Sequence, residues 1–111
     1  MSEVASINEA EFESEVMKSG VPVVVDMWAE WCGPCRILSP VVEEVSEALG
    51  PKVKFVKINV DQNPNLAARF GIMSIPTLLF FKGGQLVGQA IGAIPKGAIL
   101  DKVQEHLGVA A

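Results

Sequence analysis

The sequence has few metal-binding residues and no excess of positive charge. It contains two cysteines and one histidine, His106, whereas a structural zinc site takes about four such ligands. We expect His106 to be a solvated residue near the end of a helix. Nine Lys and Arg against thirteen Asp and Glu give a net charge of −4, and nucleic-acid binding favours clustered basic residues instead. The composition therefore predicts no metal site and no nucleic-acid partner.

Long apolar runs are also absent. Half of the residues are hydrophobic, but no run approaches the roughly 20 residues of a membrane-spanning helix. The start, Met1-Ser2-Glu3-Val4, lacks the basic and apolar regions of a signal peptide. We therefore expect no membrane association and a cytoplasmic location, with an organelle stroma or matrix open if a transit peptide was removed. With 111 residues and neither repeats nor linkers, the chain is predicted to form one domain spanning 1–111.

The two cysteines lie between a predicted strand and a predicted helix. Residues 23–28 form a short, mostly β-branched apolar run, typical of a buried strand. From Cys35 to Leu49, apolar residues recur at three- and four-residue steps, which indicates one inward face of a helix. The sequence that joins them is Trp28-Ala29-Glu30-Trp31-Cys32-Gly33-Pro34-Cys35-Arg36.

This placement predicts different roles for the two thiols. Cys32 lies at the water-accessible start of the helix, where unpaired N–H groups and the helix dipole stabilise a thiolate and lower its pKa. Cys35 falls on the inward apolar stripe. Gly33 permits close approach of a partner chain, and Pro34 suits the first helical turn. Cys32 is the predicted nucleophile, and Cys35 is predicted to resolve the intermediate.

Two inert alternatives are weaker. A structural disulfide across so short a loop would constrain the unfolded chain little. Two unreactive core cysteines are disfavoured because Trp31, Gly33 and Pro34 are poor choices for a packed helix start. A redox-active dithiol is the favoured interpretation.

The stretch Val25-Asp26-Met27-Trp28-Ala29-Glu30-Trp31-Cys32-Gly33-Pro34-Cys35-Arg36 resembles the active-site sequence of the thioredoxin family. The similarity continues through 59–64, 71–72, 75–78 and 82–84 and covers essentially the whole chain. The resemblance implies an α/β thioredoxin fold with three layers, in which four helices flank a central mixed five-stranded sheet. The order β-α-β-α-β-α-β-β-α, predicted from the hydrophobic pattern, fits that architecture.

Asp26 and Lys57 are the predicted proton-handling pair. An isolated carboxylate inside an apolar strand is costly, and desolvation raises its pKa. In the thioredoxin family the matching aspartate accepts a proton from the second cysteine, so Asp26 would serve Cys35. Lys57 follows Val53 and Phe55 at alternate positions of a predicted strand, which puts its side chain on the same buried face as theirs. The alternatives are an edge position for Asp26 and an ordinary surface position for Lys57.

The resemblance also implies a docking surface. In the thioredoxin family, the peptide bond that matches Ile75-Pro76 is cis and faces the cysteines. The backbone that precedes it can pair with an extended client segment. Met73 and Ser74 replace a common basic–glycine pair, so Met73 should make this surface more apolar. We expect Trp31 and Ile75 to be exposed and Trp28 to pack beneath. The other docking candidates have small or apolar side chains: Gly33, Pro34, Val60, Gly92 and Ala93.

The predicted function is reduction of disulfides in client proteins by the Cys32–Cys35 dithiol, without a resident cofactor. The thioredoxin resemblance implies that a thioredoxin reductase recharges the pair, with NADPH involved only through that enzyme. The chain is expected to be monomeric. One alternative is a disulfide oxidase or isomerase of the same fold, although such proteins typically carry a histidine where this chain has Gly33-Pro34. The other is a non-catalytic binding or scaffold subunit.

Overall fold

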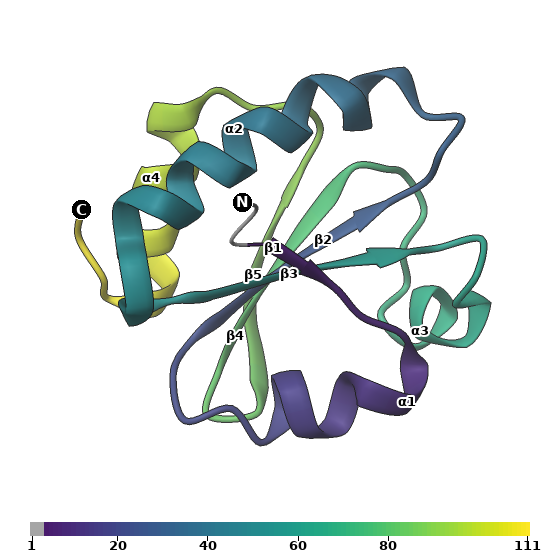
Figure 1. Cartoon of the computed structure of the whole chain (residues 1–111), viewed down its shortest axis with the longest axis horizontal. Helices are drawn as coiled ribbons and strands as arrows, with labels where there is room; N and C mark the ends of the chain where they lie inside the picture. Colours follow the sequence, from purple (N-terminus) through teal and green to yellow (C-terminus); the bar gives the residue numbers. More distant parts are fainter. Residues whose placement is uncertain (1–3) are drawn as a thin grey trace.

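The computed structural model describes residues 4–111, which form a mixed five-stranded sheet between two layers of helices (Figure 1). The strand order is β1-β3-β2-β4-β5. The strands are β1 (Val4–Ser6), β2 (Val23–Trp28), β3 (Lys54–Asn59), β4 (Thr77–Lys82) and β5 (Gln85–Ile91). The helices are α1 (Glu9–Phe12), α2 (Gly33–Leu49), α3 (Pro64–Arg69) and α4 (Lys96–Leu107). The predicted thioredoxin fold and its order of elements are confirmed.

Each face of the sheet is covered by two helices. In Figure 1, α2 and α4 lie on one side, and α1 and α3 lie on the other. Side chains alternate across β2, so Val24 packs in the cluster under α2 and α4, whereas Val25 and Met27 pack in the opposite cluster. β2 is therefore buried on both faces, which is why its sequence is a nearly continuous apolar run.

Strand direction brings the candidate site residues to one end of the sheet. β2 and β3 are parallel, and Asp26 pairs with Lys57 in their register. β4 is antiparallel to β2, and its first residue Thr77 pairs with Met27. The loop before β4, the start of α2 and the start of α3 consequently meet at the carboxyl end of β2.

Asparagine side chains fix the loops at this end. Asn8 is the N-cap of α1, and its backbone N–H donates to Glu11 Oε1 at 3.0 Å. The Asn63 side chain accepts from the Glu9 N–H at 2.9 Å and donates to the Asn59 carbonyl at 3.0 Å. Asn63, itself buried, thus ties the start of α1 to the loop that follows β3.

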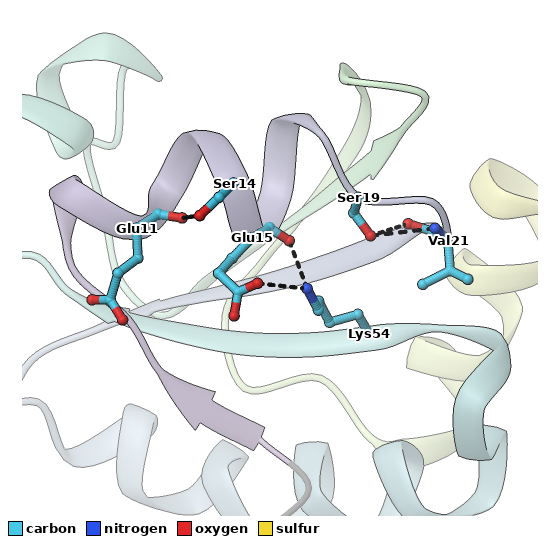
Figure 2. Close-up of polar contacts among 6 residues, drawn as sticks. All are labelled: Glu11, Ser14, Glu15, Ser19, Val21 and Lys54. Carbon is cyan, nitrogen blue, oxygen red and sulfur yellow. Dashed lines mark hydrogen bonds and ion pairs between the residues drawn. The ribbon is translucent and has the colours of Figure 1, made fainter.

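A lysine joins β3 to the segment that continues α1, as Figure 2 shows. After α1 the chain forms a π-helical turn, Glu13–Met17, closed by a 2.9 Å hydrogen bond from the Lys18 N–H to the Glu13 carbonyl. Lys54 Nζ donates to the Glu15 carbonyl at 3.1 Å and to Glu15 Oε2 at 3.0 Å. Since both side chains are partly exposed, this pair contributes at most about 1 kcal/mol.

His106 lies in the last turn of α4, as expected, but it is not fully solvated. Its ring lies 5.4 Å from the Phe80 ring, and its side chain is only 22% exposed. Gly88 on β5 makes this possible, because a Cβ there would lie 2.5 Å from the imidazole. Elsewhere on the same hairpin, Gly83 and Gly84 have φ values of 59° and 77°, which the tight turn between β4 and β5 requires.

Across residues 4–111, no helix combines the length and apolarity needed to cross a bilayer.

Candidate active site

Cys32 and Cys35 are joined by a disulfide at the junction of β2 and α2, with their Cα atoms 5.3 Å apart. Cys32 is the N-cap of α2 and has an extended backbone. The Cys35 N–H donates to Cys32 Sγ at 3.2 Å. A backbone donor and the positive end of the helix are therefore directed at the sulfur of Cys32, an arrangement that favours a thiolate there after reduction.

The two cysteines have nearly the same exposed area, 3% for Cys32 and 4% for Cys35. The expectation that Cys32 is open to water is therefore wrong for the disulfide form. Trp28 and Ile75 pack against the pair and cover it. The two cysteines differ instead in the hollow that each one lines.

Cys32 lines an open hollow of about 540 Å³, the outer groove. Its lining residues are all uncharged: Trp31, Cys32, Gly33, Pro34, Val60, Pro64, Ala67, Ile72, Met73, Ser74 and Ile75. The exposed indole of Trp31 is held in place because its Nε1–H donates to Asp61 Oδ2 at 2.8 Å. Cys32 Sγ lies 3.8 Å from the Ile75 carbonyl oxygen, and the Ile75–Pro76 bond is cis.

Not every predicted docking residue lines this groove. Pro76 is buried beneath it, and the Gly92 N–H donates to the Pro76 carbonyl at 2.8 Å. Neither Gly92 nor Ala93 is among the lining residues. Gly92, with a φ of 95°, instead turns the chain behind the Ile75–Pro76 loop.

Sequence analysis missed the part of the groove that α3 supplies. Pro64 and Ala67 line it together with Ile72 and Ser74. Nothing in the local sequence around Ala67 relates it to Cys32. The parallel strands β2 and β3 bring the starts of α2 and α3 together.

Cys35 lines a smaller hollow of about 110 Å³, the inner cavity. Its lining includes ionisable side chains from β2, β3 and the start of α2. The lining residues are Asp26, Trp28, Ala29, Glu30, Cys35, Arg36, Ser39 and Lys57.

Asp26 is the buried carboxyl of this cavity, with 5% of its surface exposed. Burial raises its pKa from 3.8 to about 7, and the nearby positive charge of Lys57 opposes part of that rise. Asp26 Oδ1 and Trp28 Nε1 have no hydrogen-bond partner among the described residues. A polar hollow of this size is large enough for a water molecule.

Lys57 lies beside Asp26 and is half-buried. Its Nζ is 5.4 Å from the centroid of the Trp28 ring, a cation–π contact that draws the ammonium group toward the cavity. No three His, Cys, Asp or Glu side chains within 4–111 form a group that could hold a metal ion.

Comparison with known proteins gives one consistent result. The family model described as Thioredoxin matches residues 3–105. Thioredoxin 1 of Nostoc sp. is 49% identical over 107 residues, which cover 96% of this chain and 100% of that protein. Thioredoxin of Haemophilus influenzae is 48% identical, with the same coverage of both chains. The M-type chloroplastic thioredoxin of Chlamydomonas reinhardtii is 48% identical over 95% of this chain and 75% of its own length. The chain belongs to the thioredoxin family.

Proposed function

We propose that this chain reduces disulfide bonds of client proteins, with Cys32 as the nucleophile and Cys35 as the resolving thiol. Membership of the family and the spacing of the cysteine pair support a thiol–disulfide oxidoreductase. One observation carries the division of roles: Cys32 lines an uncharged open groove, whereas Cys35 lines a cavity that contains a carboxyl with a pKa of about 7.

The first step takes place in the outer groove. After the client segment has bound in the outer groove, the Cys32 thiolate attacks one sulfur of the client disulfide. A bond forms between Cys32 and that sulfur, and the other client sulfur leaves as a thiolate. The Cys35 N–H and the start of α2 support the nucleophile because both favour negative charge on Cys32 Sγ.

The second step draws on the inner cavity. Asp26 accepts the proton of Cys35, and the resulting thiolate attacks Cys32. The Cys32–Cys35 disulfide forms, the mixed disulfide breaks, and two electrons have passed to the client. A carboxyl with a pKa near 7 is suited to this exchange at neutral pH. Lys57 favours its ionised form by Coulomb attraction.

Recharging requires an external electron donor. We assign this role to a thioredoxin reductase, which would bring electrons from NADPH without NADPH binding to this chain. We place the protein in the cytoplasm, or in an organelle stroma or matrix, because the similar proteins come from bacteria and include a chloroplastic form. We treat residues 1–111 as one monomeric domain whose partners are the reductase and disulfide-containing clients, not nucleic acid or membrane.

Reduction of insulin tests the proposal. In the presence of NADPH and purified thioredoxin reductase, the chain should accelerate insulin reduction, and Cys32→Ser should remove the acceleration. An inactive wild-type protein, tested also with dithiothreitol in place of the reductase, would refute the function.

The reduction potential of the Cys32–Cys35 pair distinguishes a protein that reduces client disulfides from a disulfide oxidase or isomerase. Thioredoxins have reduction potentials of about −270 mV, and strongly oxidising members of the fold have potentials of about −120 mV. We expect a value close to the former. A scaffold role would instead be indicated if a Cys32→Ser, Cys35→Ser double variant kept the protein's cellular role.

A further inference from the structure

Met73 differs sharply in exposure from the other methionines among the described residues. It lies in the loop between α3 and β4 and is 97% exposed, whereas Met27 on β2 is 0% exposed. Met17 is half-buried. Dissolved oxidants therefore reach the thioether of Met73 without any opening of the fold, while that of Met27 is shielded by the core.

The position of Met73 is also significant. It lines the outer groove on one side and a second hollow of about 220 Å³ on the other. Thr77, Gln89 and Ile91 contribute to the second hollow, and no charged residue lines either one. Met73 thus stands on an uncharged ridge next to the Cys32 site, where a docked client would cover it.

We infer that Met73 is a site of reversible oxidation, at which a hydroperoxide converts the thioether to a sulfoxide and so weakens client docking. The inference rests on the proposed function, because it assumes that clients approach Cys32 over this surface. In the reaction an S–O bond forms and the peroxide O–O bond breaks. The thioether loses two electrons, and the hydroperoxide is reduced to water or an alcohol. Methionine sulfoxide reductases reverse the change.

The physical effect follows from polarity. A thioether is apolar and adapts its shape to a neighbouring chain. A sulfoxide carries a strong acceptor oxygen that must lose its water when an apolar client segment covers it. Because the side chain is almost fully exposed in the free protein, oxidation should leave the fold intact and change docking alone.

The first measurement is the order of oxidation. The disulfide form, in which both cysteines are protected, is treated with hydrogen peroxide, catalase is added, and tryptic peptides are analysed by mass spectrometry. The peptide 70–82 contains Met73, and the peptide 19–36 contains Met27. Sulfoxide should form in 70–82 at least about tenfold faster, given the difference in exposure. Equal rates, or earlier oxidation of Met27, would overturn the assignment.

The second measurement is docking, with dithiothreitol as electron donor and insulin as client. Oxidation should raise KM roughly fivefold or more, because of the desolvation of the sulfoxide, and leave kcat little changed. For Met73→Leu, which keeps the apolar shape, the ratio of KM after and before peroxide should stay at one. Met17→Leu is the matched control and should respond to peroxide as the wild type does.

The outcomes are separable. If fully oxidised Met73 leaves KM unchanged, or if Met73→Leu remains sensitive to peroxide, the docking effect is refuted while the proposed function stands. If the untreated protein fails to reduce insulin, the proposed function is refuted and the docking effect with it. The peptide measurement still decides whether Met73 is the reactive methionine.

Discussion

The outer groove and the inner cavity meet at one disulfide, yet they are built from different kinds of structure. The groove of about 540 Å³ is lined by uncharged residues from loops and helix starts. The cavity of about 110 Å³ lies between the sheet and α2, and its lining includes Asp26 and Lys57 on adjacent central strands. In the proposed mechanism, client recognition and proton transfer would therefore take place in two different hollows beside the same disulfide.

This separation has a consequence for substitution. Loop residues at a surface change with little cost to the fold, whereas the ionisable residues Asp26 and Lys57 lie on central strands whose packing constrains what can replace them. Changes in the groove should therefore alter which clients bind and how tightly. Changes in the cavity should alter the rate, the pH dependence and the stability.

The largest expected effect comes from replacing either cysteine with serine. Cys32→Ser removes the nucleophile, so insulin reduction should fall at least about 10³-fold. Cys35→Ser leaves the first step intact and prevents the second, so a mixed disulfide with the client should accumulate. Non-reducing electrophoresis and mass spectrometry detect this species. Steady turnover by the Cys35→Ser variant would show that Cys32 in the outer groove and Cys35 in the inner cavity do not have separate roles.

The next effect is on stability. The folded protein holds the Asp26 proton with a pKa of about 7, against an ordinary value of 3.8. The favourable contribution of the neutral carboxyl is thus complete below about pH 4 and is lost as the pH rises through 7. The difference between these two pKa values corresponds to a loss in the free energy of unfolding on the order of 4 kcal/mol.

Asp26→Asn, which cannot ionise, should therefore be the more stable protein at pH 8, and its advantage should shrink towards pH 4. Urea unfolding of both disulfide forms at the two pH values measures the difference. An advantage that is independent of pH would mean that Asp26 titrates normally in the folded state. Glu44→Gln, at an exposed carboxyl of α2, is the matched control and should show no such advantage.

The same variant tests the kinetic role of the cavity. Asp26→Asn should slow resolution of the mixed disulfide roughly 100-fold at pH 7, a typical contribution of a general base. Formation of the mixed disulfide should change little because it takes place in the groove. Rapid mixing of the reduced protein with a disulfide client separates the two steps. Equal slowing of both would argue against the assignment of Asp26 to Cys35.

The smallest effect concerns the groove. Asp61→Ala removes the acceptor that holds the Trp31 indole, a hydrogen bond worth about 1 kcal/mol. KM for insulin should rise up to about fivefold, with kcat preserved. Asp61→Asn keeps an acceptor oxygen at the same place and should behave like the wild type. A fall in kcat with unchanged KM would place Trp31 in the chemical step instead.

The sequence is most informative where local pattern and chemistry coincide. The apolar run of β2, the stripe of α2 and the two cysteines between them are all present within one short segment, so the strand, the helix and their junction could be predicted. The neighbouring positions of Asp26 and Lys57 could also be anticipated, because alternation along β3 suggested the face and adjacent parallel strands supplied the pairing.

Long-range packing is what local pattern cannot supply. The cover over Cys32 and the groove lining from Pro64 and Ala67 arise from segments that meet only in the folded chain. His106 shows the same limit, since its partial burial depends on the absence of a side chain at Gly88 on a distant strand. The π-helical turn after α1 likewise has no signal in the periodicity of its residues.

The direction of α2 determines where the protein can be anchored. This helix of 17 residues is about 25 Å long, and it leads away from the cysteines toward the end of the molecule where the C-terminus lies (Figure 1). A tether attached at Ala111 would hold the molecule with its reactive end facing the solution. Immobilised in this way on a resin or an electrode, the protein should still accept bulky clients.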